Sequence, residues 1–395
     1  MTHSRAIHLV SRPLRFLLIG LAVAIFTTTA PIAADGRPGI AGGITDKPFI
    51  HADGSGTRIG GYMETHLRWE REAGFTEELT FEAKRFNLFA YAPISDRLRM
   101  VAELEFEEGG EEIVVEAALM DFDLHPAATF RMGMLLAPLG RFNLAHDSPA
   151  NELTDRPLMS TDLIGTALSE VGMGFHGSFY PTSAARVAYE IYAVNGYNDG
   201  VLVGDADGTR IPAGKGNLED NNRRPSWTGR LAVSPKPATE IGFSVHTGPI
   251  NDWEVEGLQI DARRDLTLWV VDVQAELAGF RAEGEFASAS IDAPATQPLL
   301  ASAQSGYYAQ LSRTFGYGLL NAMPGSRFTA VARLGNVDFD TDTDGDHQTR
   351  LTLGLNFRPV PDSVFKLDYQ YNWARDGFNN ETTTAGILFS AATYF

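Results

Sequence analysis

The sequence predicts an all-β protein, folded as a closed antiparallel transmembrane β-barrel of about sixteen strands. Three observations predict this fold. Short segments of alternating polarity recur along the chain, the connections between them alternate in length, and the last residue is aromatic, Phe395. Repeated short segments of this kind are the sequence signature of a membrane barrel.

Residues 98–107 illustrate the alternation. Every even-numbered position from Leu98 to Phe106 is apolar, whereas Arg99 and Glu103 occupy the opposite face, because successive side chains of a strand point to opposite faces. Sixteen such segments can be counted, although fourteen or eighteen strands stay open as alternatives. The segments are 57–69, 80–92, 97–107, 112–124, 128–137, 171–180, 185–195, 226–234, 239–248, 264–277, 279–288, 305–314, 327–337, 348–358, 363–373 and 385–395. Segment 112–124 is irregular, because Glu116 interrupts its alternation.

The connections fall into two classes of length. Short ones follow even-numbered strands, at 93–96, 125–127, 181–184, 235–237 and 359–362. Longer ones, rich in Asp, Gly and Asn, follow odd-numbered strands, at 138–170, 196–225, 249–263 and 289–304. Short periplasmic turns on one rim and long outer loops on the other are typical of bacterial barrels. A soluble β-sandwich or propeller, the main alternative, explains neither this sorting nor the terminal Phe395.

The first residues predict export. Arg5, Arg12 and Arg15 precede the uncharged apolar stretch 16–26 and a small-residue site that ends at Ala34, which is the pattern of a secretory signal. We expect residues 1–34 to be removed, residues 35–56 to form a Gly-rich N-terminal segment, and residues 57–395 to form the barrel.

Charge and cysteine content exclude several classes of function. Removal of residues 1–34 takes away three Arg and no acidic residue, which leaves 29 basic and 50 acidic side chains and a net charge of −21. A chain this acidic is an unfavourable partner for nucleic acid. The chain has no cysteine, so disulfides and thiol metal sites are excluded. We expect no cofactor.

The polar faces of the segments predict water inside the barrel. In hydrocarbon only a helix or a closed barrel pairs every backbone group, and one face of the barrel must then be apolar. The other face carries Arg, Glu, Asp, Gln and Asn at a density that no dry core could bury. A barrel of about sixteen strands is too wide for its side chains to fill, so it leaves an aqueous channel.

The long connection 138–170 is expected to fold inward and narrow this channel, with an exposed surface loop as the alternative. Loops of this length are more often functional or disordered than idle. Its acids are expected to face arginines on the polar sides of the strands, which would make a constriction of both signs. The residues expected there are Arg99, Arg131, Arg141, Asp147, Glu152, Asp155, Arg156, Asp162, Arg281, Arg333 and Arg350.

Residues 130–141, with the sequence FRMGMLLAPLGR, resemble a known family at the wall strand and the Pro-x-Gly entry to its third loop. That family is the phosphate-selective porin O and P group, and Tyr307-Tyr308-Ala309-Gln310 and the C-terminal strands are compatible with it. The resemblance implies a trimer of sixteen-stranded barrels and an arginine-lined pore in which added lysines hold phosphate. This sequence departs on the second point. In the connection 138–170, Arg141 and Arg156 stand against Asp147, Glu152, Asp155 and Asp162, a balance of −2 among these six charges.

We therefore expect a bacterial outer-membrane porin through which small hydrophilic solutes and ions diffuse passively. Its expected partners are outer-membrane lipid, lipopolysaccharide and two further copies in a homotrimer, and Phe395 is the expected insertion signal. A phosphate- or anion-selective channel of the porin O and P type is the alternative. A barrel enzyme is less favoured, because His146, Asp147 and Ser148 are adjacent in sequence, and adjacency does not establish the geometry of a catalytic triad.

Three smaller sets of residues complete the expectations. Asp340, Asp342 and Asp344 match the opening of a calcium-binding loop, but its twelfth position is Leu351 where a bidentate Glu is needed, so no specific metal site is expected. His66, His176 and His246 are expected to be isolated polar wall residues. Aromatic girdles at the membrane interfaces are expected from Tyr62, Tyr91, Phe130, Tyr189, Trp227, Trp269 and Tyr394, with Tyr62 and Tyr91 facing the interior as the alternative.

Overall fold

The computed structural model describes residues 43–44, 46–51, 56–203, 208–297 and 299–395. The expected signal, residues 1–34, and much of the segment 35–56 lie outside these residues. Within the described residues, sixteen strands form a closed barrel in which neighbours pair in antiparallel fashion. The barrel strands are β1 (Arg58–Glu72), β2 (Phe75–Pro93), β3 (Leu98–Glu107), β4 (Glu112–His125), β5 (Ala128–Leu136), β6 (Ser169–Phe179), β7 (Arg186–Val194), β8 (Ser226–Lys236), β9 (Thr239–Pro249), β12 (Asp265–Leu277), β13 (Phe280–Ile291), β14 (Ala303–Phe315), β15 (Arg327–Asp338), β16 (His347–Val360), β17 (Ser363–Arg375) and β18 (Glu381–Tyr394).

The barrel closes between its first and last strands. The register of β1 against β18 places Tyr62 opposite Tyr394, and Gly61 and Phe395 exchange two further backbone hydrogen bonds, of 3.2 and 3.1 Å. The predicted fold and the predicted number of strands are confirmed. The sequence did not predict a small separate hairpin, β10 (Glu254–Val255) with β11 (Leu258–Gln259), which lies in the connection from β9 to β12.

Side chains alternate between the two faces of the barrel wall. In β17, Lys366, Asp368 and Gln370 are buried on the inner face, whereas Phe365 and Leu367 are exposed on the outer face. An apolar outer face and a charged inner face are what lipid outside and water inside require. No helix in the described part of the chain is long and apolar enough to cross a membrane.

In the described residues, helical structure is limited to short segments before β1 and in the connections. They are η3 (Pro48–His51), η4 (Glu108–Gly110), α2 (Gly140–Leu144), η5 (Met159–Ile164), η6 (Asp199–Leu202) and η7 (Ile211–Gly214). Two of them, α2 and η5, belong to the long connection between β5 and β6, which the sequence predicted as a functional loop.

β4 is irregular at Glu116, where the sequence alternation also breaks. Glu103 and Leu104 are consecutive in β3, but their partners in β4 are Ala117 and Val115. Glu116 is therefore an extra residue on β4, which is the definition of a β-bulge. The side chain of Glu116 is buried in the interior of the barrel. The break in the sequence alternation therefore marks a bulge that directs this carboxylate inward.

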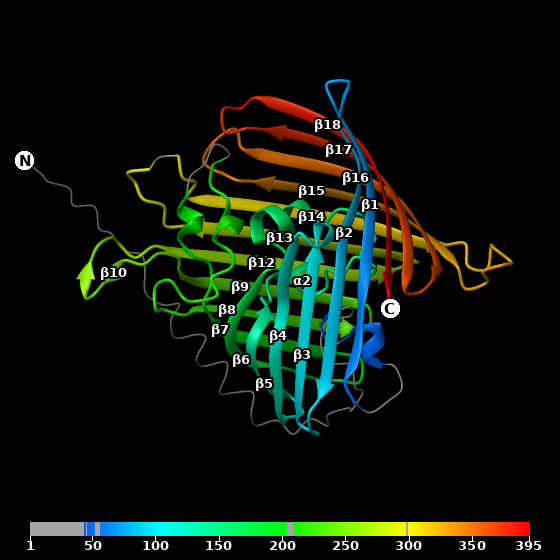
Figure 1. Ribbon diagram of the computed structural model, residues 1–395, viewed down its shortest axis with the longest axis horizontal. Helices are drawn as coiled ribbons and strands as arrows, with labels where there is room; N and C mark the ends of the chain where they lie inside the picture. Colours follow the sequence, from blue (N-terminus) through cyan, green and yellow to red (C-terminus); the bar gives the residue numbers. More distant parts are fainter. Residues whose placement is uncertain (1–42, 45, 52–55, 204–207, 298) are drawn as a thin grey trace, which may run out of the picture.

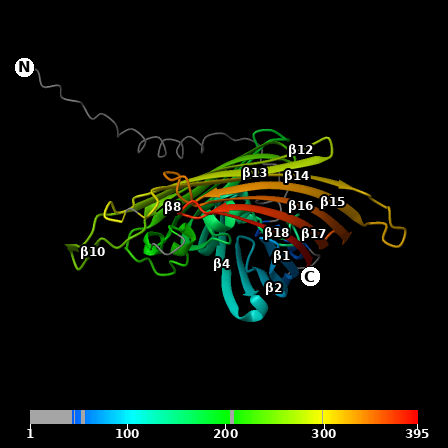
Figure 2. The same ribbon diagram turned by 90° about the horizontal axis from the view of Figure 1, so that it is seen from above.

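Most connections sort by length between the two rims, although residues 73–74 and 108–111 make short connections on the rim of the long ones. Short turns join β2 to β3, β4 to β5, β8 to β9 and β12 to β13, whereas the long connections follow β5, β7 and β9. The turn rim has one exception, residues 316–326 between β14 and β15. In Figure 2 this connection and the β10 hairpin project from opposite ends of the molecule. Figure 1 shows β1–β5 crossing steeply against β12–β17, as the two walls of a barrel with tilted strands do.

A row of phenylalanines follows the outer face of β14 to β18. Phe315, Phe328, Phe357, Phe365 and Phe389 come from five consecutive strands, and successive ring centroids are 6.0, 5.1, 6.5 and 6.3 Å apart. Rings in such a row on the outer face fit an aromatic girdle at the membrane interface. The sequence prediction did not include these residues. Phe shares the outer face with other apolar residues, so the sequence pattern does not distinguish a girdle position from any other outer position.

Several residues predicted for the girdles lie elsewhere. Tyr394 is a correction, because it lies inside the barrel in edge-to-face contact with Tyr62, with ring centroids 6.1 Å apart. Tyr62 and Tyr91 also face the interior, which was the alternative for these two. Trp227 is on the outer face and 55% exposed, as the girdle prediction requires.

Candidate functional site

The connection from β5 to β6, residues 137–168, crosses the interior of the barrel, and we call it the third loop. Its hydrogen bonds reach several walls. The Phe142 N–H donates to Glu285 of β13 (2.6 Å), and the Thr154 N–H donates to Asp368 of β17 (2.7 Å). His146 contacts the carboxylate of Glu116, from the bulge of β4, at 2.7 Å. Because these contacts lie on well-separated strands, the third loop divides the interior.

The later part of the third loop packs into a dry apolar cluster. Leu158, Met159, Leu163 and Ile164 are at most 3% exposed. Here the inner wall itself is apolar, which an entirely water-filled barrel would not favour. The partners from the wall and from the connection after β7 are Leu266, Leu268, Val270, Ala287, Ala289, Tyr197, Val201 and Ile211. Leu139, Phe142 and Leu144 of the loop are also buried.

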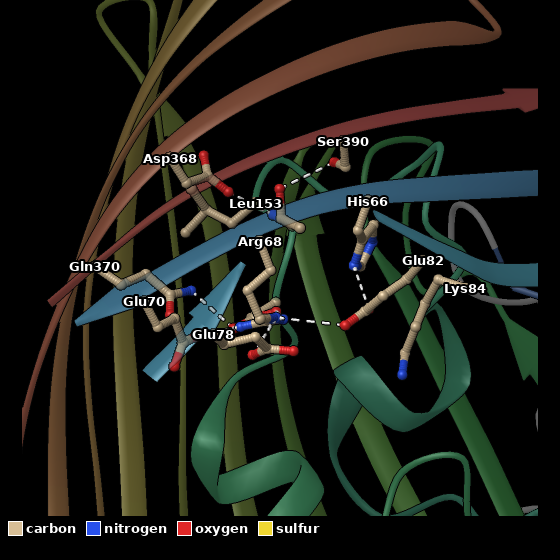
Figure 3. Close-up of polar contacts among 12 residues, drawn as sticks. His66, Arg68, Glu70, Glu78, Glu82, Lys84, Leu153, Asp368, Gln370 and Ser390 are labelled. Carbon is tan, nitrogen blue, oxygen red and sulfur yellow. Dashed lines mark hydrogen bonds and ion pairs between the residues drawn. The ribbon is translucent and has the colours of Figure 1, made fainter. Parts of the chain in front are cut away.

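Arg68 of β1 is the centre of a charged cluster beside the third loop. It donates to Glu70 and to Asp155 of the loop, both at 2.6 Å. Glu78 and Glu82 of β2 lie 3.8 and 3.9 Å from its guanidinium. Figure 3 shows Arg68 pointing into this group of carboxylates. All five side chains keep some exposure, so water reaches this part of the interior.

Asp155 is the loop residue with the most wall partners. Its carboxylate accepts hydrogen bonds from Arg68 and from Gln370 (3.0 Å) and lies 3.5 Å from Arg350. Its backbone carbonyl accepts from Arg333. Burial works against the charged form, but Arg350 and Arg68 outweigh it and hold the pKa of Asp155 well below its usual range.

The segment before Asp155 is held by β16 and β17. Asn356 donates to the Glu152 carboxylate (2.7 Å), and Arg358 lies 3.3 Å from the same carboxylate. Arg358 also donates to the carbonyl of Pro149 (2.8 Å). The Lys366 ammonium donates to two further loop carbonyls, at 2.9 and 3.2 Å. The wall therefore provides a row of cations along one side of the loop.

Of the predicted residues, Asp155 lies near Arg350 and accepts from Arg333 through its backbone carbonyl. Glu152 instead pairs with Arg358, which was not among the predicted residues. Arg99 and Arg131 do not join this group. Arg131 pairs with Asp121 at 2.7 Å, and Arg99 pairs with Asp123 at 2.6 Å. The register explains this correction, because Asp121 of β4 stands opposite Arg99 of β3 and opposite Arg131 of β5.

The other predicted residues are spread over the loop and the wall. Arg281 pairs with Glu283 of its own strand at 2.7 Å. Arg156 donates to the carbonyl of Thr166 within the third loop, at 3.1 Å. Asp162 lies in η5, where burial raises its pKa.

An internal cavity of about 60 Å³ lies between the third loop and β13–β15. Its charged lining contains groups of both signs, Arg141, Arg281 and Arg333 with Glu152, Glu283 and Glu285. Phe142 and Tyr308 add an edge-to-face aromatic pair to the lining, with centroids 6.3 Å apart. The prediction placed loop acids opposite wall arginines, whereas two of the three acids in this lining, Glu283 and Glu285, come from the wall.

The histidines are paired, which corrects the prediction that they are isolated. His66, His176 and His246 lie 2.8, 3.4 and 3.1 Å from carboxylates, those of Glu64, Asp121 and Glu170. The adjacent residues His146, Asp147 and Ser148 face separate partners, which are Glu116, Lys47 and Glu64. They form no triad.

Aspartates of the candidate calcium loop contact other residues of the protein. Asp346 pairs with Arg210 at 2.7 Å, and Asp342 accepts a hydrogen bond from Ser302 at 2.7 Å. Among the residues that the structure describes, no group of three or more His, Cys, Asp or Glu side chains is arranged to hold a metal ion.

Sequence reasoning missed Arg68, Lys366 and Arg358, which hold the third loop. A signal for Arg68 was present, because it follows Glu64 and His66 at alternate positions of the first segment. Their loop partners could not be predicted, because no local rule fixes which wall a loop reaches.

This chain resembles known proteins more in fold than in sequence. No protein-family model matches the chain. A stretch of 148 residues is 33% identical to an uncharacterized protein of Aquifex aeolicus, and the match covers 36% of this chain and only 32% of that relative.

Solved structures with similar folds are outer-membrane proteins. An anion-selective porin of Comamonas acidovorans has a TM-score of 0.58 at 10% identity, over 87% of this chain and all of that one. OprB of Pseudomonas putida has a TM-score of 0.56 at 10% identity, over 86% and 94% of the two chains. The outer membrane channel DcaP of Acinetobacter baumannii has a TM-score of 0.54 at 11% identity, over 86% and 98%. This chain therefore has the fold of bacterial outer-membrane porins.

Proposed function

We propose that this chain is a porin of the bacterial outer membrane that lets small hydrophilic solutes and ions diffuse passively. The observation that carries the proposal is the third loop, which is bonded through Asp155 and Glu152 to cations of β1, β15 and β16 across a charged interior. A loop held in this way narrows a water-filled barrel without closing its whole width. The porin fold of the compared structures supports the same function.

Export and assembly belong to the proposal. Residues 1–34 act as the signal that is removed, and the barrel then inserts among outer-membrane lipid and lipopolysaccharide. Phe395 is the insertion signal. The residue is 53% exposed, and its ring stacks on that of Phe86 with centroids 5.6 Å apart. The functional unit is a homotrimer, as the resemblance to the porin O and P group implies.

The constriction carries both signs of charge. The cavity beside the third loop is lined by three arginines and three glutamates, and opposed charges at a narrow point do not select one sign of ion as a single-sign ring does. The mature chain carries a net charge of −21, so its mouths attract cations. We therefore propose general diffusion with a weak preference for cations.

A phosphate- or anion-selective channel is the second candidate. Arg141, Arg281 and Arg333 line one cavity, and one similar structure is described as an anion-selective porin. The three glutamates of the same lining argue against it, since carboxylates at the constriction repel phosphate. A barrel enzyme has less support, because His146, Asp147 and Ser148 point to separate partners.

Single-channel recording on the purified protein in planar bilayers tests the proposal. We expect ohmic conductance, a reversal potential that shows a weak preference for cations, and no saturable block by phosphate. Strong anion selectivity with a submillimolar phosphate block would replace general diffusion by the second candidate. The absence of any conductance would contradict both.

A further inference from the structure

One surface patch inside the barrel is apolar although a porin interior is expected to be wet. Phe89, Val101, Leu119, Leu135 and Tyr192 project from β2, β3, β4, β5 and β7 and are at most 3% exposed. Apolar side chains on an inner wall are stable only if another apolar group covers them. The chain itself supplies that cover.

The cover is the segment 46–51, which we call the N-terminal segment and which contains η3. Ile50 is 5% exposed and belongs to the same apolar cluster. The ring of Phe49 lies 5.2 Å from that of Phe89 and 6.5 Å from that of Tyr394. Gly60 of β1 makes room for it, because a Cβ there would lie 2.3 Å from the Phe49 ring.

The N-terminal segment also brings a cation to the third loop. The Lys47 ammonium forms an ion pair with Asp147, and both side chains are at most 4% exposed. Asp147 accepts a second hydrogen bond from Tyr394 at 2.8 Å. Burial works against the charged form, but Asp147 and Glu103 outweigh it and raise the pKa of Lys47, so Lys47 stays an ammonium.

The carboxylates around Lys47 need this charge. Glu103 accepts a hydrogen bond from Asn87 through one oxygen (3.1 Å), and its other oxygen is buried with no hydrogen-bond partner. Glu116, on the neighbouring strand, contacts His146 of the third loop at 2.7 Å. Removing one partner of a buried ion pair leaves an uncompensated charge, which is strongly destabilising for the arrangement around it.

We propose that Lys47 and the N-terminal segment position the third loop and so set the width and ion preference of the pore. The inference rests on the proposed porin function and adds a determinant that lies outside the barrel strands. Lys47 holds Asp147, which precedes the loop residues bonded to the wall, Pro149 and Glu152. Without Lys47, the first half of the loop loses this ion pair and keeps on the β1 and β18 side only hydrogen bonds, such as those of Asp147 with Tyr394 and of Ser148 with Glu64.

Single-channel recording of four variants tests this inference. In Lys47→Met the loop should be loosened around Asp147, so conductance should rise by about a factor of two, and the unpaired acids should increase the preference for cations. Lys47→Arg keeps the charge and should stay near the wild type. Phe49→Ala loosens the same segment without a change of charge, so its conductance should also rise. Lys236→Met removes an exposed lysine of the turn rim and serves as the matched control.

A chemical rescue separates charge from general damage. The chain has no cysteine, so Lys47→Cys can be modified alone, in the unfolded state before refolding. Aminoethyl methanethiosulfonate restores an ammonium and should return conductance toward the wild type, whereas methyl methanethiosulfonate should not. Phe49→Leu is a milder variant if the lysine variants do not fold.

The outcomes distinguish this inference from the proposed function. If the wild type conducts and Lys47→Met and Phe49→Ala conduct like it, the inference is overturned while the porin function stands. A change of reversal potential in Lys47→Met without any change of conductance in Phe49→Ala would also overturn it, because Lys47 would then be only a pore charge. A wild type that does not conduct would overturn the proposed function itself.

Discussion

At the scale of single residues, Asp155 is the side chain on which the position of the third loop depends most. It has hydrogen bonds or ion pairs with Arg68, Gln370 and Arg350. Loss of a hydrogen bond to a charged group costs about 2 kcal/mol, so Asp155→Asn should lower the free energy of unfolding by roughly that amount. Urea unfolding in lipid vesicles measures the change.

The control for this variant is Asp362→Asn. Asp362 lies in the exposed turn between β16 and β17, and such surface substitutions usually stay within about 0.5 kcal/mol. Equal urea midpoints for Asp155→Asn and Asp362→Asn would show that the loop contacts add nothing to stability.

The same residue predicts a dependence on pH. Arg350 and Arg68 hold the pKa of Asp155 below its ordinary value, so the carboxylate stabilises the folded state fully above the unfolded pKa of about 3.9. That contribution is lost as pH falls below this value toward the folded pKa. The stability difference between the wild type and Asp155→Asn should therefore be constant from about pH 5 to 8 and shrink below about pH 4. A difference that already shrinks near neutral pH would contradict the assignment.

The partners of two inner-face arginines, Arg131 and Arg333, could not be predicted from the sequence. Alternation correctly put Arg131 and Arg333 on the inner face, because the period of a strand is two. Alternation does not predict which residues these two arginines contact. Arg131 meets Asp121 because the register of β4 and β5 places them opposite each other, whereas Arg333 meets a loop carbonyl. Both contacts depend on distant parts of the chain, which single-sequence patterns do not encode.

At the scale of elements, alternation and turn residues predicted the strands and turns well, but they did not predict the structure of the connections. Turn residues and apolar alternation are local signals, and so is the break at Glu116 that marks the bulge of β4. The hairpin β10–β11 and the short helical turns α2 and η5 carry too few residues to show a period. Lys47 gave no signal, because it precedes the first strand and its contact with Asp147 spans 100 residues.

The position of the strands in the membrane can be tested with two tryptophans. Trp227 of β8 pairs with Thr247 of β9, and Trp269 of β12 pairs with Val245 of the same strand. Along the register of β9, Trp269 therefore lies two residues further from the outer rim than Trp227. In variants that keep only one of the two, shallow brominated lipids should quench Trp227 more strongly, and deeper bromines should quench Trp269 more strongly.

Phe substitutions of the other tryptophans provide these single-tryptophan proteins, and Trp253 alone serves as the control. It lies in the connection next to the β10 hairpin, outside the strands, so no bromine depth should quench it strongly. Equal quenching of Trp227 and Trp269 at every depth would contradict the register-based order.

At the scale of the whole molecule, the excess of acids decides how ions approach the pore. The chain has a net charge of −18, which becomes −21 if residues 1–34 are removed as proposed, and acids gather in long connections such as residues 340–346. Exposed charges act over about 10 Å at 0.1 M salt and about 3 Å at 1 M salt. If the mouths cause the preference for cations, the reversal potential should show it at 0.1 M KCl and lose most of it at 1 M KCl.

A triple variant separates the mouths from the constriction. Replacing Asp340, Asp342 and Asp344 by Asn removes three charges while keeping side-chain oxygens that can accept from the Asp342 N–H and from the Ser302 hydroxyl. Its cation preference at 0.1 M KCl should be weaker than that of the wild type, because the surface potential at the mouth falls, while its conductance at 1 M KCl should be unchanged, because salt already screens these charges there. The charges at the constriction lie within a few ångströms of a passing ion, where salt screens much less, so they would give a preference that persists at 1 M KCl. A persistent preference in both proteins would therefore assign ion selection to the acids beside Arg281 and Arg333 and would reject the mouths as its source.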